Sequence, residues 1–179
     1  PYVQRAIKEV LVSVYNVLSL RTGRSVITAK VIQSPSNESS KELILQQALN
    51  LFAERGFSGA STREIALAAG VNHALIKYHF GNKEELWRHA MDFLFKRLDQ
   101  TMEAVAREAK GIEDTVERCK VYLARYIRYC AKHPEHARIM IQESTGENPR
   151  LAWVVRNYFV PTRRILEKDY EELMDRGSI

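Results

Sequence analysis

Residues 62–80 read TREIALAAGVNHALIKYHF, and this stretch has the features of two short helices joined by a tight turn. Two helices can cross closely only where small side chains meet, and Ala66 and Ala69 supply them. Gly70 allows a sharp turn, and Val71 offers an apolar side chain to plug the space beneath it. The pattern predicts a helical hairpin in which the second helix is held rigidly against the first.

Helix caps and glycines bracket this hairpin and its neighbours. Pairs with the spacing of a helix N-terminal cap occur at Ser39–Glu42, Ser61–Glu64 and Asn82–Glu85, Asn72 precedes the second helix of the hairpin, and glycines follow at positions 56, 70 and 81. A side-chain oxygen at the cap accepts a hydrogen bond from a free backbone N–H group, and a glycine readily ends a helix. The spacing therefore predicts three short helices and then a long one from Lys83 toward Lys110.

The second helix of the hairpin has one face to bury and one face to expose. Ile76 and Phe80 are its apolar anchors, which leaves His73, Lys77 and Tyr78 directed largely outward. A helix with such a face fits the major groove of DNA, which is about 12 Å wide. The backbone N–H groups that follow the predicted caps are also natural seats for phosphates. A hairpin that merely packs is an equally good interpretation of the periodicity alone.

The residue pattern goes further than the periodicity. The run from Glu42 to Leu86 closely resembles the N-terminal domain of TetR-family transcriptional repressors. The resemblance depends on four motifs together: ERGF at 54–57, TREIALAAGV at 62–71, YHF at 78–80 and NKEEL at 82–86. It covers about a quarter of the chain, and it implies a DNA-binding helix-turn-helix followed by a variable helical domain for ligand binding and dimerisation.

The resemblance also implies which residues contact DNA. It implies phosphate contacts from Thr62, Arg63, Lys77, His79 and Lys83, and base-edge or groove-facing roles for His73, Ala74, Leu75 and Tyr78, with Asn72 at the start of the same helix. Two positions depart from the family pattern, since family members often have Tyr at position 77 and a small or polar residue at position 75. Leu75 cannot donate a hydrogen bond, so it would either contact a thymine methyl group or pack with Ile76. His79 would either contact a phosphate or form a hydrogen bond with the following helix.

The fold class predicted for the whole chain is all-α. We expect a helix-turn-helix DNA-binding domain over residues 38–86 and a helical ligand-binding and dimerisation domain over residues 87–179. Within the latter, helices are expected over 116–132, 135–144 and 150–176. Pro161 should kink or split the last of these, because proline lacks the backbone N–H and clashes with the preceding turn.

Residues 1–34 resemble the family's C-terminal dimerisation helix rather than an N-terminal segment. An apolar stripe at helical spacing runs from Val3 to Leu18, and the TGR at 22–24 is a familiar family ending. The order in the natural protein is therefore expected to be roughly 38–179 followed by 1–34. The alternative is a true N-terminal helix packed on the DNA-binding unit.

The family resemblance implies the partners as well. A homodimer would place two recognition helices in successive major grooves of a palindromic DNA operator, about 34–36 Å apart. A small-molecule inducer would bind among the later helices and tilt the long helix that begins at Lys83. Aromatic and sulfur-containing side chains on these helices are the pocket candidates, although core packing explains each equally well: Phe95, Tyr122, Tyr126, Tyr129, Met140, Trp153 and Tyr158.

Composition limits the other function classes. The net charge of +5 is spread along the chain, and residues 41–89 carry six basic and five acidic side chains, so bulk charge does not argue for DNA binding. No apolar run approaches the roughly 18 residues of a membrane span, and two cysteines point to a reducing compartment, so a cytoplasmic protein is expected. We find no catalytic constellation, no cofactor motif and only a weak metal candidate in His133 and His136. A helical protein-interaction adaptor and an all-helical enzyme remain the alternatives to a DNA-binding regulator.

Overall fold

The computed structural model describes residues 37–145 and 148–161. These residues form helices and connecting turns without a strand, which confirms the predicted all-α class. The predictions for residues 1–34, and for the helix beyond residue 161, lie outside the described residues. The described part divides into two compact units, one made of residues 37–94 and 134–142 and the other of residues 95–133, 143–145 and 148–161.

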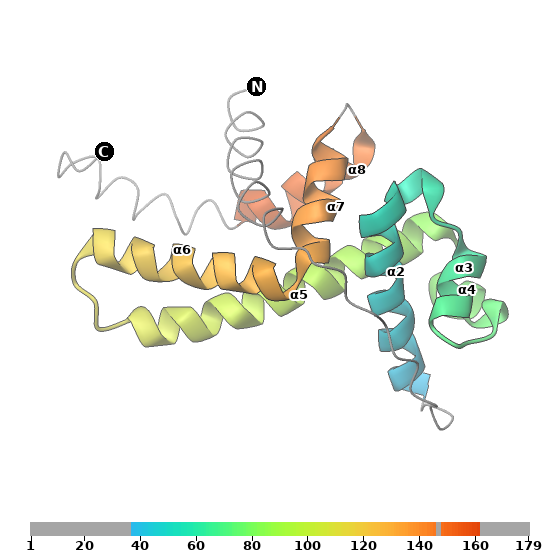
Figure 1. Cartoon of the computed structure of the whole chain (residues 1–179), viewed down its shortest axis with the longest axis horizontal. Helices are drawn as coiled ribbons and strands as arrows, with labels where there is room; N and C mark the ends of the chain where they lie inside the picture. The colour runs from blue at the N-terminus through green and yellow to red at the C-terminus, as the bar shows by residue number, and fades with distance from the viewer. Residues whose placement is uncertain (1–36, 146–147, 162–179) are drawn as a thin grey trace. The chain divides into compact units, whose positions relative to one another are not determined.

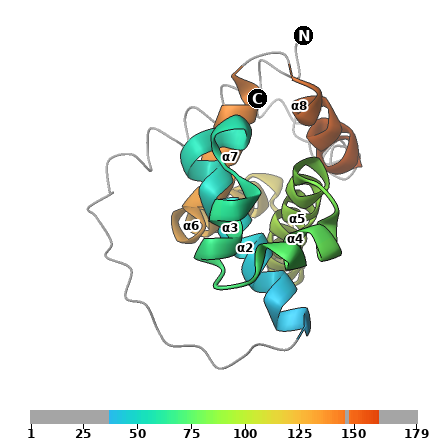
Figure 2. The ribbon, with the colours of Figure 1, turned by 90° about the vertical axis from the view of Figure 1, so that its right-hand side faces the viewer.

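The first unit contains the predicted helix-turn-helix. Its elements are α2 (Asn37–Gly59), α3 (Thr62–Ala68), α4 (His73–Phe80), the first part of α5 (Lys83–Ala109) and most of α7 (Pro134–Ser144). Helix α3 packs against both α2 and α4, and Figures 1 and 2 show the three lying together. The unit has a continuous apolar core, whose largest fully buried side chains include Phe52, Ile65, Ile76, Trp87 and Met91.

The caps explain where these short helices begin and end. The Ser61 hydroxyl accepts a hydrogen bond from the Glu64 N–H, and the Glu64 carboxylate accepts one from the Ser61 N–H, so the predicted capping box is confirmed. The Asn72 side chain accepts from the Ala74 N–H at the start of α4. The glycines at positions 70 and 81 have φ angles of 65° and 75°, a backbone conformation that favours glycine over other residues. Short sequence signals therefore determine the length of α3 and α4.

Helix α2 differs in detail from its predicted bounds. It starts at Asn37, two residues before the predicted cap at Ser39, and its helical geometry breaks at Gly56, where φ is 72° and ψ is 173°. The prediction that Gly56 ends the helix is thus confirmed, and a short turn continues to Gly59. The Gln142 side chain of α7 donates a hydrogen bond of 2.9 Å to the Ala53 carbonyl one turn before this break. That bond ties the end of α2 to a residue 89 positions later in the chain.

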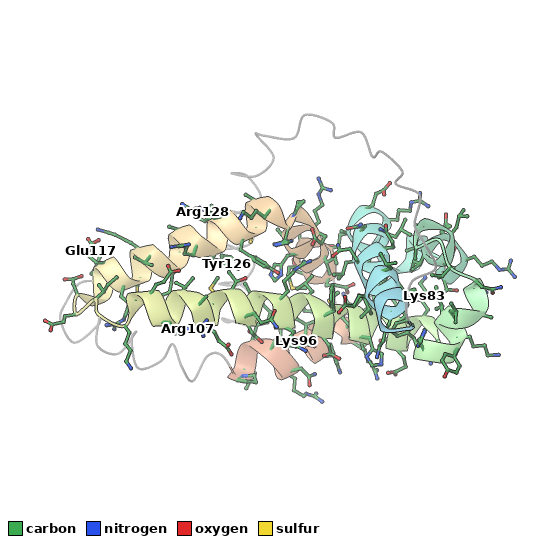
Figure 3. All side chains as sticks on the ribbon, turned by 90° about the horizontal axis from the view of Figure 1, so that it is seen from below. Lys83, Lys96, Arg107, Glu117, Tyr126 and Arg128 are labelled. Atoms are coloured by element: carbon green, nitrogen blue, oxygen red, sulfur yellow. The ribbon has the colours of Figure 1, made fainter. Side chains whose placement is uncertain are left out.

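The second unit is built on an antiparallel helix pair, the remainder of α5 and α6 (Thr115–Lys132), which lie side by side in Figures 1 and 3. The Asp114 side chain caps α6 by accepting from the Glu117 N–H. Contacts between the two helices include Arg97 with Tyr129 and Glu108 with Arg125. Side chains at opposite ends of the unit's α5 segment therefore hold the two helices in register.

The last described helix is irregular before its proline. It consists of α8 (Pro149–Val154) followed by a π-helical turn, η1 (Val155–Phe159), in which the Val160 N–H donates to the Val155 carbonyl. The sequence predicts a kink at Pro161, and the distortion is found in the turn immediately before it. A widened turn relieves the clash between a proline ring and the carbonyl four residues earlier.

Within residues 37–145 and 148–161, every helix is too short or too polar to cross a bilayer.

Candidate nucleic-acid interface

The exposed face of α4 is the central feature of the first unit. Ile76 and Phe80 are 2% and 4% exposed and hold the helix against its neighbours. Tyr78 is 75% exposed, and the side chains of His73 and Lys77 are exposed as well. The helix is thus rigidly seated on one side and open to solvent on the other, as the sequence predicts.

The remaining predicted DNA contacts surround this face. Arg63, Asn72 and Ala74 are exposed, whereas Thr62 and Leu75 are half-buried. The Asn72 side chain is engaged in capping α4 through its oxygen. The half-buried state of Leu75 is compatible with both of its predicted roles, contact with a thymine methyl group and packing against Ile76.

Thr62 and His73 are joined across the hairpin. Thr62 Oγ1, at the start of α3, lies 3.0 Å from His73 Nε2, at the start of α4. Both residues were predicted as DNA contacts, one to a phosphate and one to a base, yet their spacing of 11 residues gives no indication that they form a pair. The structure therefore links two predicted contacts that the sequence treats as separate.

Lys83, at the start of α5, makes internal contacts. Its Nζ donates to the Ser58 carbonyl over 3.4 Å and lies 4.6 Å from the centre of the Phe57 ring. Figure 3 shows Lys83 beside α2. The lysine thus stabilises the junction between the end of α2 and the start of α5, in addition to any contact with a phosphate.

His79 lies between two aromatic neighbours on its own helix. Its ring centre is 5.0 Å from that of Tyr78 and 5.9 Å from that of Phe80. His79 Nε2 is buried and has no hydrogen-bond partner among the described residues. The structure thus gives no bond at this nitrogen to the following helix, which was one of the two predicted roles of His79.

A charged contact connects α2 to the cap of α3. Arg55 Nη1 lies 2.6 Å from a carboxylate oxygen of Glu64, the residue that completes the capping box with Ser61. Hydrogen bonds from the Ser61 hydroxyl and N–H hold the pKa of Glu64 below its ordinary value, and the positive charge of Arg55 acts in the same direction. The carboxylate form is therefore favoured in the folded state.

We expect the Glu64→Gln substitution to lower the melting temperature by at most a few degrees at pH 7. A carboxyl group with a lowered pKa in the folded state contributes stability above its unfolded pKa, and that contribution is lost as the pH falls through the folded pKa. The difference between the two proteins should therefore shrink as the pH falls below the ordinary glutamate pKa and close only below the lowered folded-state pKa, where both side chains are uncharged. Circular dichroism melts from pH 3 to pH 8 measure it, and a difference independent of pH would contradict the electrostatic explanation.

The predicted ligand-pocket residues fall into separate groups. Phe95 and Tyr158 stack with ring centres 3.9 Å apart and planes within 9°, and Trp153 meets Tyr158 edge-on at 5.6 Å. These three belong to one aromatic cluster of the second unit. Met140, in contrast, is 2% exposed and lies in the first unit. The structure therefore brings three of the seven candidates together and places Met140 in the other unit's core.

The tyrosines of α6 form the other group. Tyr129 is 4% exposed and accepts a hydrogen bond from Arg97, and burial raises the pKa of Tyr126, with Cys130 contributing. Figure 3 shows Tyr126 where α5 and α6 face each other. Tyr122 is half-buried. Within residues 37–145 and 148–161, no group of three or more His, Cys, Asp or Glu side chains is arranged to hold a metal ion.

Comparison with known proteins identifies the first unit. Residues 44–90 match the family model described as bacterial regulatory proteins, tetR family. Among curated relatives, the chain is 29% identical over 134 residues to the probable HTH-type transcriptional regulator YttP of Bacillus subtilis, covering 75% of this chain and 64% of that protein. It is 42% identical over 82 residues to the HTH-type transcriptional repressor Rv3405c of Mycobacterium tuberculosis, covering 46% of this chain and 43% of that protein. The chain therefore spans less than two thirds of these relatives.

Solved structures show that the similarity extends beyond the matched segment. HlyIIR, a hemolysin II transcriptional regulator, superposes with a TM-score of 0.64 at 28% identity, covering 79% of this chain and 76% of that chain. AibR, solved with isovaleryl coenzyme A and operator DNA, has a TM-score of 0.64 at 23% identity over 78% and 75% of the two chains, which shows a shared fold. The predicted resemblance is confirmed both in the helix-turn-helix and in the helical architecture that follows it.

Proposed function

We propose that this chain, which carries at residues 44–90 a segment of the tetR family of bacterial regulatory proteins, is a ligand-responsive repressor of transcription that binds a palindromic operator as a homodimer. The observation that carries the proposal is that α4 is buried on one face and exposed on the other. Ile76 and Phe80 anchor the helix, and His73, Lys77 and Tyr78 remain exposed on one face. A rigid helix with one free polar face is what a major groove accepts.

The phosphate contacts support the same orientation. Thr62 and Arg63 lie at the start of α3, Lys77 lies in the last turn of α4, and Lys83 begins α5. These side chains lie at both ends of α4, where the two sugar-phosphate backbones that border the major groove would pass. A few positive charges suffice for DNA binding if each lies where a phosphate would be. This explains how the nearly neutral segment 41–89 can bind DNA.

The ligand response is proposed to act through α5. This helix is common to both compact units, since residues 83–94 belong to the first and residues 95–109 to the second. Phe95, in the aromatic cluster, therefore directly follows the part of α5 that belongs to the first unit, about three turns along the helix from Lys83. A ligand that moves α5 needs a coupling of only about 1–3 kcal/mol to change operator affinity 5- to 150-fold. The complex of AibR with isovaleryl coenzyme A and operator DNA makes acyl thioesters a reasonable first class of ligands to test.

Selection of bound duplexes from a random DNA pool tests the proposal. We expect the selected sequences to contain two inverted half-sites with centres about one helical turn, or 10–10.5 base pairs, apart or a multiple of that spacing. Affinity for the best duplex should fall steeply with salt and exceed affinity for a scrambled duplex by about 10³-fold or more.

Two outcomes would contradict the proposal. Equal retention of every duplex would mean that the protein does not recognise sequence. Absence of DNA retention at low salt would favour the adaptor or the enzyme, the alternatives that the sequence leaves open.

A further inference from the structure

The contact between Thr62 and His73 has two possible directions. Oγ1 and Nε2 are 3.0 Å apart, and a hydroxyl group can either donate or accept a hydrogen bond. An imidazole nitrogen accepts if it lacks a hydrogen and donates if it carries one. In the free protein, both arrangements satisfy the observed distance.

A DNA phosphate bound by Thr62 excludes one of the two directions of the Thr62–His73 hydrogen bond. This step rests on the proposed function, in which Thr62 contacts the DNA backbone. Phosphate oxygens only accept hydrogen bonds, and the threonine hydroxyl has a single hydrogen to give. Once that hydrogen points to a phosphate, the bond between the two residues can persist only if His73 Nε2 carries a hydrogen and donates it to Thr62 Oγ1.

For a neutral ring, the direction of this bond decides what the other ring nitrogen can recognise. In a neutral imidazole with its hydrogen on Nε2, the Nδ1 atom is an acceptor. In the major groove, the hydrogen-bond donors are the amino groups of adenine and cytosine, whereas guanine and thymine present acceptors at the corresponding edge. The His73 side chain is exposed on the α4 face that would enter the groove.

We propose that Thr62 and His73 act as one recognition unit, in which the phosphate contact of Thr62 sets the tautomer of His73 and thereby its preference for an adenine or cytosine amino group. Thr62 is then a positioning residue for base readout as well as a phosphate contact. His73 determines specificity at one position of each half-site. If Thr62 contacted only a phosphate and His73 only a base, independently of each other, neither of these roles would follow.

Selections from a random duplex pool with matched variants test this coupling. The wild-type protein should enrich one particular base pair at one position of each half-site, and His73→Ala should lose that preference. Thr62→Val, which removes the hydroxyl at similar volume, should lose the same preference and weaken binding to the wild-type duplex about tenfold or more. Thr62→Ser retains the hydroxyl and should keep the preference, with affinity within about threefold of wild type.

The double variant separates coupling from two independent losses. Thr62→Val/His73→Ala should bind the selected duplex within about threefold of the weaker single variant, because both substitutions break one unit. If the double variant instead shows the product of the two single-variant losses in affinity, the inference is overturned. It is also overturned by a Thr62→Val protein that binds more weakly but keeps the wild-type base preference. If the wild-type protein enriches no sequence at all, the proposed function itself fails, which is a different result.

The tautomer can be observed directly. Long-range nitrogen–proton NMR spectra of protein labelled with 15N-histidine distinguish a neutral ring protonated at Nε2, a neutral ring protonated at Nδ1 and a doubly protonated ring. We expect His73 to carry its hydrogen on Nε2 alone in the complex with the selected duplex. Either of the other two forms in that complex would overturn the inference, because Nδ1 would then be a donor.

Discussion

Reversing the charge of Lys77 is expected to weaken specific DNA binding strongly while leaving the fold intact. Lys77 is exposed in the last turn of α4, and no packing of the helix depends on its side chain. In the proposed homodimer, Lys77→Glu removes two phosphate contacts, each worth about 1.5–3 kcal/mol as a hydrogen bond to a charged group. The expected loss of affinity is therefore roughly 100-fold or more.

The salt dependence identifies the cause of that loss. Removal of one phosphate contact per protomer should reduce the slope of log K against log salt concentration by about 2. Lys96→Glu changes the net charge equally at an exposed site on α5, and it should leave both affinity and slope nearly unchanged. Fluorescence anisotropy with the selected duplex from about 50 to 200 mM salt makes the measurement. Equal losses from the two substitutions would show that only net charge matters.

Removing the Phe80 ring is expected to have the largest effect on stability. Phe80 is 4% exposed, its ring centre is 5.5 Å from that of His89 on α5, and Lys41 Nζ on α2 lies 6.0 Å from the ring centre. The ring therefore fills the place where α2, α4 and α5 meet. Phe80→Ala should lower the free energy of unfolding by about 3–5 kcal/mol, which is a large fraction of the 5–15 kcal/mol typical of a folded domain.

A conservative variant provides the control for Phe80→Ala. Phe80→Leu keeps most of the buried volume and should cost less than about 1.5 kcal/mol. Urea unfolding followed by circular dichroism at 222 nm compares the three proteins. A loss below about 1 kcal/mol for Phe80→Ala would mean that this ring does not hold the recognition helix in place. Because a loosened α4 samples orientations that do not fit the groove, operator affinity should fall in the same order.

Local signals made the helix-turn-helix predictable. The capping box of Ser61 and Glu64, the Asn72 cap and the turn glycines act over two or three residues, so their spacing alone determines where α3 and α4 begin and end. The burial of Ile76 and Phe80 also follows from helical periodicity. The π-helical turn before Pro161 was foreseen only as a kink, because a proline disturbs a helix without specifying how the backbone adjusts.

The ligand-pocket candidates show where sequence reasoning becomes weak. Aromatic side chains at helical spacing are equally suited to a core and to a cavity, so the pattern selected seven residues without separating the two roles. The structure stacks Phe95 on Tyr158 and buries Met140 in the first unit. These outcomes depend on how helices cross, which no local pattern determines.

For the described residues, the sequence by itself determined which segments are helices, where α3 and α4 end, and which face of α4 is exposed. Only the tertiary structure decided the partners of the side chains: Thr62 with His73 across 11 residues, Lys83 with the Ser58 carbonyl across 25, and Gln142 with the Ala53 carbonyl across 89. The physical reason is the distance along the chain over which each kind of interaction acts. Caps and periodicity operate within one or two turns of a helix, whereas these contacts exist only after helices distant in the chain have packed together.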